Sequence, residues 1–184
     1  MSRAVEGSRV ETAMLSLKQS AHAVQGQGDQ TIRVRKARIA DVSAMHAMIK
    51  HYAEKQLMLP KAHLQLYETL RDYSVAVDAG DDSSVLGCGS LHLYWEDLAE
   101  IRAVAVLPGL AHKGVGSRIV EALIEEGRSY RLEQIFVFTY VPAFFSRFGF
   151  VQVEHRSMPL KVFNECFHCP KFNTCDELAM VLHL

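Results

Sequence analysis

A strand that passes through a short turn into a helix, at residues 100–124, constrains the fold more than any other feature of this sequence. The apolar run at 100–106 predicts a strand, which the pair Pro108-Gly109 stops. From Gly114 onward the apolar residues recur at helical spacing, which predicts an amphipathic helix. Its apolar face carries Val115, Ile119, Val120, Leu123 and Ile124. A strand joined to a helix in this way indicates an α/β domain.

The turn before this helix contains Gly114 and Gly116, and we expect it to bind a phosphate. Without side chains at these positions, backbone N–H groups can approach an anion closely. The start of the helix adds unpaired donors and the positive end of the helix dipole, and Lys113 adds a point charge. The alternative is that both glycines serve only an ordinary tight turn.

The rest of the sequence predicts a tail followed by one domain. Residues 1–30 are rich in glycine, serine and glutamine, which predicts a flexible N-terminal tail ahead of a domain at 31–184. Asp41 is predicted to be the N-cap of a helix, and further helices are predicted after Pro60 and at 144–148. Strands are also expected at 31–37, 73–77, 85–94, 135–139, 150–153 and 177–184, with a turn at 79–82.

Composition narrows the classes of function. A hydrophobic content of 49% and a charged content of 22% are typical of a soluble globular protein. The net charge of -1 gives no reason to expect nucleic acid or an anionic membrane as a partner. No apolar run approaches the roughly 20 residues that span a bilayer, and the N-terminus shows no apolar secretory segment. Cys166, Cys169 and Cys175 cluster while Cys88 stands alone, so we expect unpaired thiols and a reducing, cytoplasmic location.

The stretch 111–117 resembles the acetyl-CoA motif of the GNAT acetyltransferases, (Gln/Arg)-x-x-Gly-x-(Gly/Ala), with Ala111 in place of Gln or Arg. The β-rich run 134–139 and the segment 144–150, an aromatic-x-x-x-Gly-Phe pattern, resemble the same family. This resemblance covers about residues 31–184. It implies an α/β (α+β) GNAT fold, with a mixed central β-sheet flanked by helices, and acetyl-CoA as the co-substrate.

The same resemblance implies which residues bind the cofactor. The backbone of the strand would contact the pantetheine and the thioester, and the residues concerned are Val104, Ala105 and Val106. The turn would hold the pyrophosphate, through His112, Lys113, Gly114, Val115, Gly116 and Ser117.

Several separate runs of the sequence resemble short-form N-acetylglutamate synthases, namely 57–61, 66–68, 71–73, 98–106 and 161–180. This resemblance implies acetyl transfer to the α-amine of L-glutamate, the first step of arginine biosynthesis. The kinase domain of the longer synthases is not expected here. Two alternatives stay open: a GNAT enzyme with another amine acceptor, such as glutamine or a protein amine, and a non-catalytic acyl-CoA-binding regulator. A homodimer also stays open.

Acetyl transfer needs a base, because an α-ammonium must lose a proton before it can attack the thioester. A positioned carboxylate, acting directly or through water, accelerates such a step by about 10²–10⁴-fold. By the resemblance, Glu100 occupies the position of this base. The alternative is a surface glutamate or an ion pair with Arg102, which lies two residues along on the same face. Strand N–H groups near Val104 to Val106 are expected to stabilise the oxyanion.

The acid that protonates the leaving thiolate is less directly indicated. Many members of the family use a tyrosine at the position that Phe145 occupies here, and the serine of the kinase-fused synthases corresponds to Val141. Tyr140 is the nearest replacement and is our candidate. The alternative is that Tyr140 is an aromatic residue of the core or of its rim.

A glutamate acceptor has two carboxylates, which arginine forks bind well. Arg35 matches a substrate-binding arginine of the related synthases, and Lys171 lies where those enzymes supply a second cation. Arg102 is a third candidate if it shares the face of Glu100. For each of the three, the alternative is a solvated surface charge.

The cysteine cluster raises the question of a metal. Cys166, His168, Cys169 and Cys175 contain the ligand types of a Cys₃His zinc site. A complete zinc module has two paired knuckles, and this sequence has only one complete pair. We therefore predict that no metal is bound, and keep zinc as the alternative.

Overall fold

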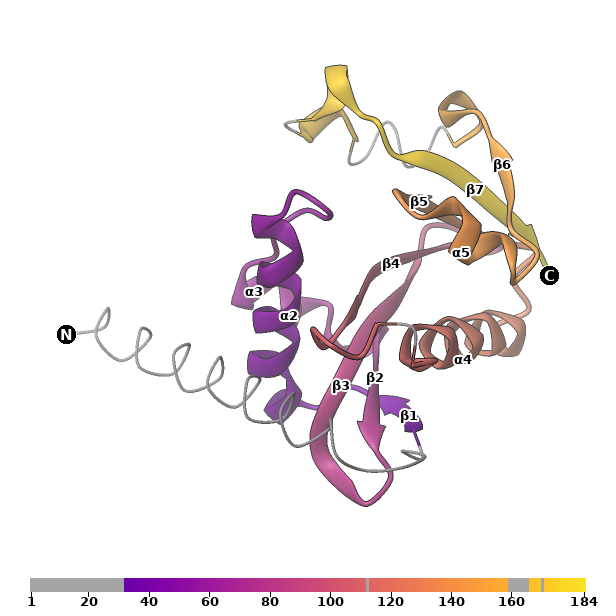
Figure 1. Ribbon diagram of the computed structural model, residues 1–184. Coiled ribbons are helices and arrows are strands. Elements are labelled where there is room, and N and C mark those ends of the chain that lie inside the picture. Colours follow the sequence, from indigo (N-terminus) through magenta and orange to yellow (C-terminus); the bar gives the residue numbers. More distant parts are fainter. Residues whose placement is uncertain (1–31, 112, 159–165, 170) are drawn as a thin grey trace. The chain divides into compact units, whose positions relative to one another are not determined.

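The computed structural model describes residues 32–111, 113–158, 166–169 and 171–184 (Figure 1). The tail predicted at 1–30 lies outside the described residues, as does His112. The chain forms two compact units. The first contains the described residues up to Ser90 together with Ala103–Ala122, and the second contains Leu91–Arg102 and Leu123–Leu184.

Seven strands of the described chain hydrogen-bond in the order β1-β2-β3-β4-β5-β7-β6. They are β1 Ile32–Lys36, β2 Tyr73–Asp78, β3 Asp81–Leu93, β4 Leu98–Val106, β5 Gln134–Thr139, β6 Val151–Val153 and β7 Leu178–His183. Strands β4 and β5 pair in parallel, whereas β1 with β2, β2 with β3, β5 with β7 and β6 with β7 pair antiparallel. This confirms the predicted mixed sheet of an α/β (α+β) fold.

The helices of the described chain are α2 Val42–Glu54, α3 His63–Glu68, α4 Val115–Ser129 and α5 Pro142–Ser146. Short 3-10 turns lie at η1 Ile39–Asp41, η2 Leu70–Asp72, η3 His155–Ser157, η4 Cys166–His168 and η5 Phe172–Thr174. Among the described helices, none combines the length and the apolar character that crossing a bilayer requires.

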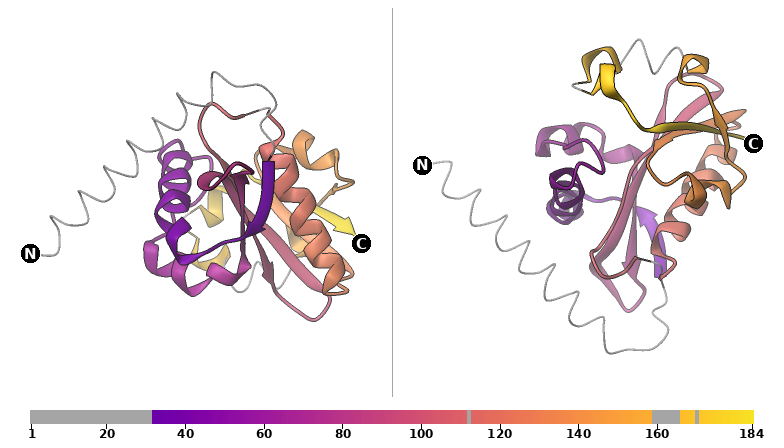
Figure 2. Two further views of the ribbon diagram at one scale, coloured as in Figure 1. Left: turned by 90° about the horizontal axis from the view of Figure 1, so that it is seen from below. Right: turned by 45° about the horizontal axis from the view of Figure 1, so that its top comes forward.

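The first unit packs helices on both faces of its strands. Helices α2 and α3 cover one face, and the first half of α4 covers the other (Figure 2). Helix α2 follows the predicted apolar spacing, because the residues it buries are Val42, Met45, Ala47, Met48 and Ile49. The hydroxyl of Tyr52, near the end of α2, donates a 2.8 Å hydrogen bond to the carbonyl of Val106 on β4. The last turn of α2 is thereby tied to the end of that strand.

Gly87 on β3 brings β4 and α4 close to each other. A Cβ at this position would lie 2.9 Å from the carbonyl oxygen of Ala105, 2.9 Å from Ile119 Cδ1 and 3.0 Å from Val115 Cγ1. These separations are below van der Waals contact, so a side chain here would force the strand and the helix apart. The absence of a side chain at Gly87 therefore sets the position of the first turn of α4.

Asp41 occupies the predicted N-cap position of α2, but its side chain makes no capping hydrogen bond to that helix. Its carboxylate accepts instead from the guanidinium of Arg35, at 2.7 Å, and from the backbone N–H of Arg38, also at 2.7 Å. The 3-10 turn η1 leads directly into α2, so the backbone at Asp41 is already helical.

The second unit is built around β5. This strand pairs with β4 on one side and with β7 on the other, and β6 extends the sheet at the edge of β7 (Figure 1). Phe136, Met158 and Val181 form a buried apolar cluster. Tyr94, Leu98, Phe138 and Val153 pack against it.

The bounds of the helix predicted at 144–148 are wrong by two residues. Helix α5 begins at Pro142, because proline at the first helical position has a favourable backbone angle and loses no hydrogen bond. It ends at Ser146, where the N–H groups of Phe148 and Gly149 bond back to Phe145 and Ser146. Gly149 then adopts a φ of +91°, which continues the chain into β6.

Candidate active site

The turn before α4 is built from two successive backbone hydrogen bonds. The N–H of Leu110 donates to the carbonyl of Leu107 at 3.0 Å, and the N–H of Lys113 donates to Leu110 at 3.2 Å. Gly114 follows with a φ of +82°, and a Cβ built there would meet nothing within 4 Å. Glycine is thus required by the backbone angle, and the space beside it is open.

The first turn of α4 presents its N–H groups beside this open space. The N–H of Arg118 bonds back to the carbonyl of Gly114 at 3.0 Å. The N–H groups of Val115 and Gly116 precede this bond, in the part of a helix that has no intrahelical acceptors. Lys113 and Gly114 are exposed. This geometry has the features of an anion site at a helix N-terminus.

Strand β4 changes conformation at Ala103, where φ is +53°. Its parallel register with β5 runs from Leu98 to Glu100, which lies opposite Phe136. After Ala103, the residues predicted to contact pantetheine continue along the strand, with Ala105 buried and Val104 and Val106 half-buried. A left-handed residue inside a strand acts like a bulge and changes the direction of the peptide groups that follow.

Glu100 lies in a polar cluster of the second unit. Its carboxylate is only 3% exposed. Arg102 Nε lies 3.2 Å from Glu100 Oε2, and the hydroxyl of Tyr94 donates to the same oxygen at 3.3 Å. Arg102 Nη2 also donates to the Tyr94 hydroxyl at 3.3 Å. The ion pair considered as an alternative for Glu100 is therefore present, and it fixes the orientation of the carboxylate. The role of Glu100 as a base stays a prediction.

Sequence reasoning missed Tyr94. Its ring lies 5.3 Å from that of Phe136, and the guanidinium of Arg102 lies 5.5 Å from its centre. A tyrosine that directly follows the end of β3 carries no local signal of this contact, because the contact depends on the hairpin between β3 and β4. The hairpin closes through the backbone bond from Tyr94 N–H to the carbonyl of Leu98, at 2.9 Å.

Tyr140 and Lys171, two residues predicted for different roles, contact each other. The Lys171 ammonium donates to the Tyr140 hydroxyl at 3.0 Å, and that hydroxyl donates to Asp176 Oδ1 at 2.8 Å. Burial raises the pKa of Tyr140; the bond from Lys171 opposes this rise and the bond to Asp176 adds to it. The hydrogen bond to Tyr140 raises the pKa of Lys171. Asp176, which sequence reasoning missed, completes the cluster.

Arg35 is surrounded by acceptors in the first unit. Its Nη1 and Nη2 bind the two oxygens of Asp41 at 2.7 and 3.0 Å, and its Nε binds Asp82 at 2.8 Å. The carbonyls of Lys36 and Asp82 accept the remaining two hydrogens, at 3.1 and 2.9 Å. The hydrogen bond from Arg35 lowers the pKa of Asp82 to about 2. All five donors are used, which favours a structural role; the predicted role in binding substrate stays a prediction.

The cysteines are reduced thiols in the structure. Cys166 and Cys169 are half-buried and Cys175 is exposed. Within the described ranges, no three His, Cys, Asp or Glu side chains are placed to hold a metal ion together.

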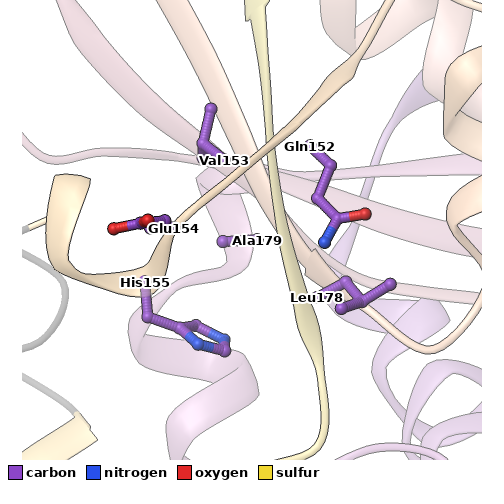
Figure 3. A pocket seen from close by; sticks show the side chains of 6 residues that line it. All are labelled: Gln152, Val153, Glu154, His155, Leu178 and Ala179. Carbon is purple, nitrogen blue, oxygen red and sulfur yellow. The ribbon is translucent and has the colours of Figure 1, made fainter.

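A hollow of about 440 Å³ lies in the second unit, where β6 pairs with β7 (Figure 3). Its lining consists of Gln152, Val153, Glu154, His155, Leu178 and Ala179. The ring of His155 stacks on Phe138 at 5.1 Å. None of the residues predicted for the active site lines this hollow.

The comparisons with known proteins agree with the fold. Residues 43–150 match the acetyltransferase (GNAT) family. The chain belongs to this family. The family uses acetyl-CoA, so this chain is an acetyltransferase with acetyl-CoA as co-substrate. The resemblance inferred from the glycine turn and the aromatic segment is thereby confirmed.

Individual proteins of known sequence or structure are similar to this chain over most of its length. The chain is 39% identical over 132 residues to an amino-acid acetyltransferase of Mycobacterium tuberculosis, covering 72% of this chain and 75% of the relative. The crystal structure of Rv2747 from M. tuberculosis, in complex with CoA and NLQ, matches with a TM-score of 0.72 and 33% identity, covering 83% of this chain and 99% of that one. N-acetylglutamate synthase from Neisseria gonorrhoeae, complexed with coenzyme A and N-acetyl-glutamate, has a TM-score of 0.72. At 20% identity over 85% of this chain and 36% of that chain, this last likeness shows the fold alone.

The surroundings of Arg35 predict the effect of its replacement. In Arg35→Met the carboxylate of Asp41, 5% exposed, keeps only a backbone partner. Removing one member of a buried ion pair costs about 3–5 kcal/mol, so the free energy of unfolding measured in urea should fall by that amount. Arg33→Met, two residues along β1, is the matched control, because the Arg33 side chain is 49% exposed. The control should lose less than about 1 kcal/mol. An Arg35→Met variant of normal stability with a strongly raised KM for the acceptor would instead support the predicted role in binding substrate.

Proposed function

We propose that the protein transfers the acetyl group of acetyl-CoA to the α-amine of L-glutamate, the first step of arginine biosynthesis. One observation supports this most: β4 holds a buried, oriented carboxylate, Glu100, and the same strand leads into the open glycine turn at the start of α4. In this proposal Glu100 would serve as the base and the glycine turn as the anion site. The 39% identity to an amino-acid acetyltransferase, and the runs that resemble N-acetylglutamate synthases, indicate an amino acid as the acceptor.

The turn is proposed to bind the pyrophosphate of acetyl-CoA. The backbone N–H groups of Val115, Gly116 and Ser117 would donate to the phosphate oxygens, and Lys113 would add its charge. Ala111 departs from the family motif, which has Gln or Arg there, and removes one phosphate contact. Backbone groups at 104–106 would then bind the pantetheine and the thioester oxygen.

The chemistry proceeds from the amine. Glu100, directly or through water, accepts a proton from the α-ammonium, and the freed nitrogen attacks the thioester carbon. The oxyanion that forms is stabilised by backbone N–H groups of β4. The C–S bond then breaks, and Tyr140 is proposed to protonate the thiolate.

Glutamine is the second candidate acceptor, and the surroundings of the three predicted cations favour considering it. Arg35 binds Asp41 and Asp82, Arg102 binds Glu100, and Lys171 binds Tyr140. A side-chain carboxylate of the acceptor must compete with these partners, whereas a side-chain amide has no charge to neutralise.

An acetylation assay over a panel of acceptors, with product detection by mass, tests the proposal. A charge-assisted hydrogen bond contributes about 1.5–3 kcal/mol, so kcat/KM for glutamate should exceed that for glutamine by about 10- to 100-fold. A preference for lysine or for a peptide N-terminus would refute the glutamate acceptor and leave the acetyltransferase activity intact. CoA binding without acetylation of any acceptor would instead indicate the non-catalytic regulator.

Gly114→Val tests the placement of the pyrophosphate. The substitution puts a side chain into the open space before α4, and we expect the CoA affinity measured by calorimetry to fall at least about tenfold, the equivalent of 1.4 kcal/mol. Gly109→Val is a matched control, because Gly109 has a similar φ of +91° and a Cβ there also meets nothing within 4 Å. The control shares the backbone strain and should keep its CoA affinity. Equal losses in both variants would show that strain, and not the position, is responsible.

Glu100→Gln tests the base. The substitution keeps the shape of the side chain and removes its basicity, so kcat should fall by about 10²-fold or more. Binding of CoA should stay unchanged. Glu125→Gln, on the exposed side of α4, serves as the control and should leave both quantities unchanged. Turnover close to normal across the pH range in Glu100→Gln would remove this residue from the mechanism.

A further inference from the structure

Tyr140, Lys171 and Asp176 form a cluster whose position is fixed by strand register. Thr139, the last residue of β5, lies opposite Leu178, the first residue of β7. Tyr140 directly follows the first of these residues, and Asp176 lies two positions before the second. The antiparallel pairing of β5 with β7 therefore brings the phenol and the carboxylate together, although 36 residues separate them in sequence.

Lys171 reaches the same phenol from a segment held by its own turns. The N–H of Phe172 donates to the carbonyl of Cys169 at 3.0 Å, and the N–H of Thr174 donates to that of Lys171 at 2.9 Å. The ammonium lies 3.0 Å from the Tyr140 hydroxyl and 5.3 Å from the centre of its ring. It thus contacts the hydroxyl oxygen and lies beside that end of the ring.

We propose that Lys171 and Asp176 are positioning residues for Tyr140, and that Lys171 stabilises the phenolate formed when Tyr140 protonates the leaving thiolate. This inference rests on the proposed acetyl transfer. It changes the role of Lys171, because the ammonium then serves the acid of the reaction and not the carboxylate of the acceptor.

The proton transfer is balanced within these groups. The thiolate sulfur takes the proton of the Tyr140 hydroxyl, so that an S–H bond forms as the O–H bond breaks. The negative charge moves from sulfur to the phenolate oxygen, beside the Lys171 ammonium. Solvent then returns a proton to the phenolate, while the proton that Glu100 took from the amine passes to solvent. No oxidant or further reactant is needed.

The two partners act on Tyr140 in opposite directions. The cation of Lys171 stabilises the phenolate and lowers the pKa of Tyr140, whereas Asp176 accepts a hydrogen bond from the neutral phenol and raises this pKa. Asp176 thus keeps the acid protonated before the reaction, and Lys171 makes loss of the proton possible. The charge of Glu177, the neighbour of Asp176 in sequence, also raises the pKa of Tyr140.

The ionisation of Tyr140 can be measured without any activity. The protein has six tyrosines, so the tyrosinate absorbance of the Tyr140→Phe variant is subtracted from that of the parent to isolate this residue. Since a neighbouring charge moves a pKa by about one pH unit or more, Lys171→Met should shift the titration to higher pH and Asp176→Asn to lower pH by about that amount. Lys171→Arg should restore the parent midpoint. A midpoint that moves in neither variant overturns the proposal.

Kinetics distinguish the proposal from binding of the acceptor by Lys171. In Lys171→Met, kcat should fall about tenfold, a part of the 10²–10⁴-fold that a general acid supplies, with KM unchanged for both substrates. The basic limb of the kcat–pH profile should move in the same direction as the absorbance titration. A raised KM for glutamate with normal kcat overturns the proposal and restores the substrate-binding role.

If the parent protein acetylates no acceptor, the proposed function fails, and the absorbance titration still decides whether this cluster controls Tyr140. Circular dichroism confirms the fold of each variant, and Lys171→Arg provides the test if Lys171→Met does not fold.

Discussion

The backbone of β4 at Ala103 is the constraint on which the rest of the candidate site depends. A left-handed conformation costs a residue with a Cβ about 1–2 kcal/mol, so the φ of +53° must be maintained by contacts around it. Those contacts are visible in the first unit. The thiol of Cys88 lies 3.9 Å from the carbonyl of Ala103, Gly87 leaves room for the carbonyl of Ala105, and Tyr52 binds the carbonyl of Val106. Strain in the strand is thus offset by packing and hydrogen bonding to β3 and α2.

This arrangement divides β4 into two parts with different chemistry. Up to Glu100 the strand is paired with β5, and its buried carboxylate is oriented by Arg102 and Tyr94. After Ala103 it carries the residues that the family resemblance assigns to the cofactor. The same absence of a side chain at Gly87 that admits the carbonyl of Ala105 also admits Val115 and Ile119 of α4. One glycine therefore sets both the strand and the first turn of the helix that follows it.

The sequence predicts the elements well where the signal is local. Three features can be recognised from neighbouring residues alone: the helical period of α2, the apolar run of β4 and the glycine turn before α4. All three lie close to their predicted bounds. The sequence does not predict contacts between residues that lie far apart along the chain. The carboxylate of Asp82 binds Arg35 from 47 residues away, and Asp176 meets Tyr140 only through the register of β5 with β7. The missing cap at Asp41 has a local cause, because the side chain of Arg35 and the backbone N–H of Arg38, six and three residues before it, bind its carboxylate.

The partners of the predicted cations also bear on the choice of acceptor. Each of the three cations predicted for substrate binding already contacts another group of the chain. Arg35 binds aspartates, Arg102 binds a glutamate and Lys171 binds a tyrosine hydroxyl. A carboxylate that approaches any of them gains only the difference between the new contact and the one it displaces. Replacing one contact of a cation by another changes the binding free energy little. Hydrogen bonds within proteins stabilise modestly for the same reason, because they replace hydrogen bonds to water. Cations that already have partners should therefore distinguish an acid from its amide by no more than the roughly 10- to 100-fold that one charge-assisted hydrogen bond supplies. Strong discrimination would require a cation that no other part of the chain holds, or a carboxylate partner that moves away when the acceptor binds.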